Sequence, residues 1–273
     1  MLYYAISFEP TIIMALLPLV SEQSKGMAQT IKNLHQILDY LGTHPDTKIR
    51  YYPSGMILNV YSYVYYLSAI DVRSIAVGYF FLWWKPQDKH PIHLNRAIFT
   101  LCHILKFVAA SSTESELRTL FLNSKEDKIL RLTLQELGHP QPPTPIHYEN
   151  STATGIANGT IKRQRSRSME MRYSYICDLV KHKEVKVKWH LGQENIGYYV
   201  SKHHNTKHHQ KVRPIYLHEA NSPHMLTRAI KPSILEGCVG TIPGVYLRAL
   251  PLHIYRVTKT PVPWIRTQVT PAT

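Results

Sequence analysis

The chain has 273 residues, of which 44% are hydrophobic, so it is long enough to bury one substantial core with extensions. Lys and Arg number 32 against 18 Asp and Glu, which gives a formal net charge of +14. This surplus favours a polyanionic partner, with nucleic acid ahead of a membrane, although a merely basic surface is an equal alternative on charge alone. Cys102, Cys177 and Cys238 lie far apart without a CxxC pair. The cysteines therefore indicate neither a disulfide framework nor a zinc site, and they favour a reducing compartment.

The N-terminal region predicts two helices. Residues 11–20 (TIIMALLPLV) form an apolar run that contains Pro18, lacks a preceding basic region and is too short to span a bilayer. We therefore expect an intracellular protein, cytoplasmic or nuclear, with neither a secretion signal nor a transmembrane segment. Residues 24–41 form a second helical pattern, whose apolar face carries Ile31, Leu34, Ile37, Leu38 and Leu41. Neither helix has a visible partner apart from the other, so we expect both to pack loosely or not at all.

From Met56 onward the apolar pattern becomes that of strands. Residues 57–67 and 75–84 are rich in β-branched and aromatic side chains, and residues 97–108 form a third such run. After a long helical stretch, PIHY at 145–148 and EVKVKWH at 184–190 predict a fourth and a fifth strand. This order predicts a mixed α/β fold.

The long helical stretch, which begins near Ser111, contains the first candidate for chemistry. Thr113 followed by Glu116 fits a capping box, which would give Glu116 a purely local role, and Gly138 ends the helix. The fourth strand, however, leads directly into Glu149. Glu116 and Glu149 could then meet at one end of the sheet, where paired carboxylates hold Mg²⁺ against a phosphate backbone.

Basic residues cluster late in the chain. KRQRSRS at 162–168 precedes a helical pattern, and arginine there could make bidentate contacts with phosphate, although a solvated loop explains the composition equally well. Two pairs of adjacent histidines, at 203–204 and 208–209, have no acid or cysteine at ligand spacing, so a metal site there is not favoured. The candidate nucleic-acid-binding residues are Lys162, Arg163, Arg165, Arg167, Arg172, Lys186, Lys188 and Lys202.

Several motifs occur in an order that resembles the ribonuclease H domain at the end of copia-type retrotransposon polyproteins. They are SSTESEL, PIHYENSTATGI, KRQRSRSMEMRY and WHLGQENIGYYVSKHH, with LYYA, SEQSKG, LDYLGTHPD and RPIYLH on either side. The resemblance implies a ribonuclease H-like five-stranded mixed sheet, with three antiparallel strands first, flanked by helices. It also implies three regions: residues 1–45 as the helical end of a reverse transcriptase, 50–205 as the ribonuclease H-like domain, and 206–273 as a basic, proline-rich tail. The Asp-Asp motif of the polymerase is not in the sequence.

In that family four carboxylates hold two Mg²⁺ ions that cleave the RNA strand of an RNA–DNA hybrid. The first, an Asp in a motif resembling HSDASYL, is replaced here by Tyr63 within YSYVYYL. The second, the Glu of an SSTEAEL-like motif, is retained as Glu116, and the third, the Asp of a DN pair, corresponds to Glu149 before Asn150. The fourth, the Asp of a GDY-like motif, is replaced by Tyr198.

These replacements predict the loss of catalysis. Mg²⁺ requires hard anionic oxygen at about 2.1 Å in near-octahedral geometry. A tyrosine phenol, with a pKa of about 10, is neutral at pH 7 and too long to stand in for Asp. The first Asp bridges both metals in the family, so its replacement by Tyr63 removes the two-metal clamp. Glu116 and Glu149 are therefore expected to be too few to retain Mg²⁺.

Three hypotheses follow from the sequence. The first is a degenerate copia-type ribonuclease H-like domain, a pseudoenzyme that binds an RNA–DNA hybrid or duplex. The second is an active Mg²⁺-dependent ribonuclease H in which a recruited acid joins Glu116 and Glu149. The third is a domesticated protein-interaction module that presents the aromatic side chains of Tyr63, Tyr65 and Tyr66 to a partner.

Overall fold

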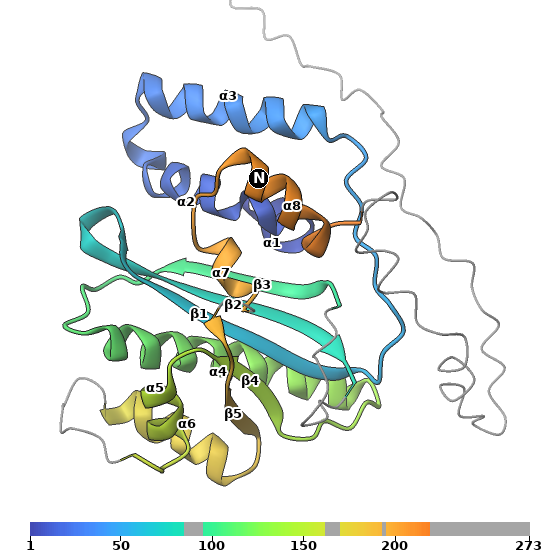
Figure 1. Ribbon diagram of the computed structural model, residues 1–273, viewed down its shortest axis with the longest axis vertical. Helices are drawn as coiled ribbons and strands as arrows, with labels where there is room; N and C mark the ends of the chain where they lie inside the picture. The colour runs from blue at the N-terminus through green and yellow to red at the C-terminus, as the bar shows by residue number, and fades with distance from the viewer. Residues whose placement is uncertain (85–94, 162–169, 193–194, 219–273) are drawn as a thin grey trace, which may run out of the picture. The chain divides into compact units, whose positions relative to one another are not determined.

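The computed structural model describes residues 1–84, 95–161, 170–192 and 195–218 (Figure 1). The described residues all belong to one compact unit. None of the helices in the described ranges is long and apolar enough to cross a membrane.

The centre of the fold is one five-stranded mixed sheet. Its strands are β1 (Ile57–Ala69), β2 (Arg73–Trp83), β3 (Ala97–Ile104), β4 (Thr144–Tyr148) and β5 (Val185–Trp189), in the order β3-β2-β1-β4-β5. β1, β2 and β3 pair antiparallel, whereas β4 runs parallel to both β1 and β5. The short helix η3 (Ile70–Val72) joins β1 to β2. The predicted architecture, a five-stranded mixed sheet with three antiparallel strands first and helices on its flanks, is confirmed.

Alternation along the strands divides the core into two layers. Leu58 and Val60 of β1 point into a cluster with α4 (Ser112–Glu136), α5 (Ser151–Ala157) and α6 (Glu170–Lys181). We call this side of the sheet the α4 face. Tyr61 and Tyr63 point to the opposite side, the tyrosine face, where they join a second cluster. Figure 1 shows helices on both sides of the sheet.

The tyrosine face is covered by helices from both ends of the described chain. From the N-terminal end come α1 (Leu2–Ser7), η1 (Pro10–Ile12), α2 (Ile13–Ser21), η2 (Gln23–Lys25) and α3 (Ala28–Thr43). From the other end come α7 (Gly197–Val200) and α8 (Thr206–Tyr216). The fold thus places the two ends of the described chain against the same side of the sheet.

The expectation of loosely packed N-terminal helices is wrong for residues 2–21. Ala5, Ile13 and Leu16 are buried in the core cluster of the tyrosine face, because that side of the sheet is as apolar as the other and needs a cover. α3 differs, since Ile37 is buried whereas Ile31 is 58% exposed. The sequence correctly predicted two helical stretches here, but it did not reveal the sheet as their partner.

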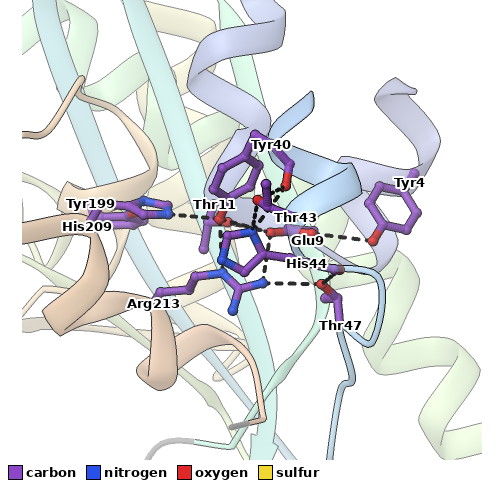
Figure 2. Close-up of polar contacts among 10 residues, drawn as sticks. All are labelled: Tyr4, Glu9, Thr11, Tyr40, Thr43, His44, Thr47, Tyr199, His209 and Arg213. Atoms are coloured by element: carbon purple, nitrogen blue, oxygen red, sulfur yellow. Dashed lines mark hydrogen bonds and ion pairs between the residues drawn. The ribbon is translucent and has the colours of Figure 1, made fainter. Parts of the chain in front are cut away.

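A buried polar network joins these N-terminal helices to α8 (Figure 2). Arg213 Nη2 lies 3.3 Å from Glu9 Oε1, and both side chains are less than a tenth exposed. Arg213 Nε donates a hydrogen bond of 2.9 Å to the Tyr40 hydroxyl, which lies 2.8 Å from His209 Nε2. The opposite nitrogen of His209 bonds to the Tyr199 hydroxyl. Residues 206–218, which the sequence groups with the tail, therefore belong to the folded unit.

Candidate functional site

Two tyrosines meet at the position where the resemblance places two metal-binding acids. Tyr63 on β1 is 5% exposed, and its ring packs edge-to-face on that of Tyr198 in α7, with 5.5 Å between centroids. Gly197 permits this approach, because a Cβ there would lie 3.0 Å from Tyr63 Cβ. Burial first, and then the charge of Glu149, raise the pKa of Tyr63, so its phenol stays neutral at pH 7.

Glu116 points toward the same site and does not cap its own helix. The N-cap of α4 is Ser111, whose hydroxyl accepts a hydrogen bond from the backbone N–H of Glu114, while Glu114 Oε2 accepts one from Ala110 N. The capping box predicted for Thr113 and Glu116 is therefore wrong, because the helix begins two residues earlier than that pairing requires. Glu116 instead accepts a hydrogen bond from Asn150 Nδ2. Burial raises the pKa of Glu116, and the bond from Asn150 partly offsets this.

Glu149 follows β4 directly and lies near both Glu116 and Tyr63. Its backbone carbonyl accepts a hydrogen bond of 2.8 Å from Trp189 Nε1, which fixes the end of β4 against β5. Its carboxylate reaches Gly192, where a Cβ would lie 2.2 Å from Glu149 Oε2. Burial first, and then the charge of Glu116, raise the pKa of Glu149. The longer side chain at this position is therefore accommodated by a residue that has no side chain of its own.

The structure thus brings together the four positions that the sequence predicted to converge: Tyr63, Glu116, Glu149 and Tyr198. We call them the tyrosine–glutamate site. Their donor set does not fit a pair of Mg²⁺ ions, because it offers two carboxylates and two phenols where the two-metal arrangement needs four anionic ligands. Within the described ranges, no three side chains of His, Cys, Asp or Glu gather closely enough to hold a metal.

The predicted nucleic-acid-binding residues fall into separate groups. Lys162, Arg163, Arg165 and Arg167 lie outside the described residues. Arg172 lies on α6, which packs on the α4 face of the sheet. Lys186 and Lys188 alternate along β5 with the buried Val185 and Val187, so they point to the other face of the sheet. Lys202 lies beside the tyrosine–glutamate site. The structure therefore does not bring Arg172 together with the two lysines of β5.

A basic and aromatic cluster that the sequence did not single out surrounds Arg172. The guanidinium of Arg172 lies 5.6 Å from the centre of the Phe107 ring, and that of Arg118 lies 5.3 Å from the centre of the Phe121 ring. Burial and the nearby charge of Arg172 lower the pKa of Arg118. Partial burial, followed by the charges of Lys106 and Arg118, lowers the pKa of His103. We call this group the Arg118 patch; its members are His103, Lys106, Phe107, Arg118, Phe121 and Arg172.

Sequence reasoning missed the Arg118 patch because its residues come from three segments. Lys106 and Phe107 follow β3, Arg118 and Phe121 lie about one helical turn apart on α4, and Arg172 lies in the first turn of α6. One signal was available. Arg118 and Phe121 have the i, i+3 spacing that places two side chains on one helical face.

Comparison with known proteins adds only distant likenesses. No family model matches the sequence, and no curated protein matches it either. A ribonuclease H1 isolated from compost by a metagenomic approach aligns with a TM-score of 0.39 at 7% identity, over 53% of this chain and 92% of that one. A crystal structure of that ribonuclease H1 in complex with an RNA/DNA hybrid aligns with a TM-score of 0.36 at 8% identity, over 51% of this chain and 88% of that one. The N-terminal RNase H domain of a Mycobacterium tuberculosis protein, fused to maltose-binding protein, also has a TM-score of 0.36 at 8% identity. That alignment covers 51% of this chain and 86% of that one.

Proposed function

We propose that this chain is a degenerate ribonuclease H-like domain of copia-type retrotransposon origin that binds an RNA–DNA hybrid or duplex without cleaving it. The binding half of the proposal is carried by the Arg118 patch. Two guanidiniums, Arg118 and Arg172, lie close enough for one charge to lower the pKa of the other. Such a like-charge pair is unfavourable alone, and a phosphate between the two groups removes the repulsion.

The two phenylalanine rings of the Arg118 patch also favour phosphate binding. Phe107 and Phe121 hold the two guanidiniums over their faces, which limits the rotamers of both arginines before any ligand arrives. Lys106 and His103 add nearby donors for further phosphates. These contacts carry no base-specific information, so we expect little sequence preference.

The loss of cleavage is supported by the donor set of the tyrosine–glutamate site. Tyr63 and Tyr198 replace two acids, and the bond from Asn150 uses one oxygen of Glu116. The nuclease hypothesis would need a third acid close by. Within the described residues none joins Glu116 and Glu149.

Binding and cleavage are tested on the same protein preparation. Fluorescence anisotropy with a labelled hybrid should show affinity that falls steeply with salt, by a slope of about −0.9 for each phosphate contact. Arg118→Glu with Arg172→Glu should weaken binding and flatten that slope. A matched control, Lys181→Glu, changes the charge at the far end of α6 and should have a much smaller effect. Gel analysis with Mg²⁺ or Mn²⁺ should show intact RNA.

The alternatives predict different results. Metal-dependent cleavage of the RNA strand would establish the nuclease hypothesis in place of ours. An affinity for the hybrid that changes neither with salt nor in the Arg118→Glu, Arg172→Glu variant would contradict the nucleic-acid hypothesis. The third hypothesis, a protein-interaction module, would then be favoured.

A further inference from the structure

The side chain of Lys202 is surrounded by tyrosines at the tyrosine–glutamate site. Its Nζ lies 3.9 Å from the centre of the Tyr198 ring, 4.7 Å from that of Tyr65 and 5.8 Å from that of Tyr63. An ammonium within about 6 Å of an aromatic face is attracted by the negative charge over the ring. Three rings from two different elements, β1 and α7, therefore surround one cation.

The charges around Lys202 fit this arrangement. Burial alone would lower the pKa of Lys202, but the phenols of Tyr198 and Tyr63 raise it above its usual value, so the amine is charged at pH 7. The positive charge of Lys202 in turn partly offsets the rise in the pKa of Glu149. The site thus has a positive charge of its own, which partly offsets the negative charge of Glu149.

A divalent metal ion and the ammonium of Lys202 require different ligands. Mg²⁺ prefers carboxylate oxygens and dehydrates reluctantly, whereas aromatic rings offer it no such ligand. An ammonium has the opposite preference, because it gains from ring faces and from one nearby carboxylate without needing several anions. The exchange of two acids for Tyr63 and Tyr198 therefore changes which class of cation the site can hold.

We infer that Tyr63, Tyr65 and Tyr198, with Glu149, form a binding site for an organic ammonium, which Lys202 fills from within and thereby closes to divalent metal ions. This inference does not rest on nucleic-acid binding, which involves the Arg118 patch. The site has lost the chemistry of a metal centre but has kept the capacity to hold a positive charge. Removing the lysine side chain should open it to an external ammonium.

The first experiment observes Lys202 directly. Reductive ¹³C-dimethylation of the lysines keeps their positive charge, and ring currents should move the Lys202 signal upfield of the exposed lysines. Lys202→Arg assigns the signal, and Tyr198→Leu should return it to the exposed position. Lys207, which is exposed at the start of α8, is the matched control and should be unaffected by Tyr198→Leu. A Lys202 signal among the exposed lysines in the unchanged protein would overturn the inference.

The second experiment tests the site with a foreign ammonium. In Lys202→Ala, tetramethylammonium should shift the ¹³C signals of Tyr63 and Tyr198 in a saturable way. Its affinity should exceed that for the unchanged protein by roughly tenfold or more, since the tethered ammonium no longer competes. Lys207→Ala should behave like the unchanged protein. Equal affinity in all three proteins, or broadening of the Tyr63 and Tyr198 signals of the unchanged protein by dilute Mn²⁺, would overturn the inference.

Discussion

Asp127 shows how a single buried charge can set the pH dependence of stability. It lies within α4 on the side that faces the sheet and is 1% exposed. Burial raises its pKa to about 7, although the nearby charge of Arg131 opposes the rise. The folded state therefore binds a proton that the unfolded state releases at lower pH, so stability should fall as the pH rises from about 4 to about 7.

Replacing Asp127 by Asn should remove the loss of stability between about pH 4 and about pH 7. Because one pKa unit corresponds to about 1.4 kcal/mol, we expect Asp127→Asn to raise the free energy of unfolding at pH 8 by on the order of 2–4 kcal/mol, and by less at pH 5. Urea unfolding at both pH values measures this. Glu136→Gln, an exposed change on the same helix, should leave the difference between the two pH values unaltered. A gain for Asp127→Asn that is equal at pH 5 and pH 8 would contradict the prediction.

The tyrosine–glutamate site makes a second prediction at the scale of residues. Tyr63→Asp, Glu149→Asp and Tyr198→Asp together would place carboxylates beside Glu116 at the positions where the resembling ribonuclease H family has them, but Lys202 would remain among them. We expect this triple variant to bind Mn²⁺ weakly, and the addition of Lys202→Ala to tighten binding by roughly tenfold or more, because a positive charge is removed. Calorimetric titration with Mn²⁺ compares the two. Equal affinity would show that Lys202 does not compete with a metal.

The sequence predicted this site better than it predicted its surroundings. The motifs placed Tyr63, Glu116, Glu149 and Tyr198 in one location, since strand pairing and helix packing follow the apolar pattern and not the metal ligands. Lys202 was read as a phosphate contact because a linear sequence does not show that its side chain lies over three rings. The Arg118 patch was missed for the same reason.

The helix α4 packs directly on β1 and β2 of the sheet. Asn123 Nδ2 donates hydrogen bonds of 2.8 Å to Ser62 Oγ and 3.0 Å to the Val77 carbonyl, so the helix is joined to β1 and β2. Gly78 makes room for this contact, because a Cβ there would lie 2.2 Å from Asn123 Oδ1. The small residue in β2 therefore sets how near α4 can lie.

Adding one methyl group at Gly78 should push α4 and the sheet apart. We expect Gly78→Ala to lower the free energy of unfolding by about 1–3 kcal/mol, the usual cost of overpacking a dense core. Thermal and urea unfolding measure the change. The control is Gly42→Ala in α3, where nothing lies within 4 Å of the added Cβ and alanine suits a helix better. Equal effects at the two positions would show that the contact of Asn123 with β2 does not limit the packing.

At this scale the apolar pattern predicted the strands and the long helix, with small errors at their ends. The third strand was expected to reach residue 108 but ends at Ile104, because the following residues turn toward the N-cap Ser111. Trp189, the last residue of β5, is 56% exposed, and its indole bonds to the end of β4. Strand ends depend on such tertiary bonds, which alternation alone cannot show.

In the whole molecule, the buried pair of Glu9 and Arg213 joins the two ends of the described chain. Glu9→Gln or Arg213→Met alone leaves one buried charge without its partner. Each should lower the free energy of unfolding by about 3–5 kcal/mol. The double variant should cost clearly less than the sum of the two single changes, because neither charge remains. Urea unfolding of all four proteins completes the cycle.

Additive losses would contradict a direct interaction between Glu9 and Arg213. A matched control is the exposed pair of Arg73 and Asp71. The same double-mutant cycle there should give an interaction energy below about 1 kcal/mol. The sequence could not predict the buried pair. Its residues are 204 positions apart, and although Arg213 begins the RPIYLH motif, nothing in that motif indicates Glu9 as its partner.

That separation has a consequence during synthesis on the ribosome. At about 5–20 residues per second, Arg213 is made about 10–40 s after Glu9. Throughout that interval the apolar N-terminal helices cannot make their contacts with α8, which shares their core cluster. The nascent chain must therefore keep its first helices from aggregating before the last one arrives. Its yield in a cell should depend on the speed of translation and on chaperones that bind exposed apolar segments.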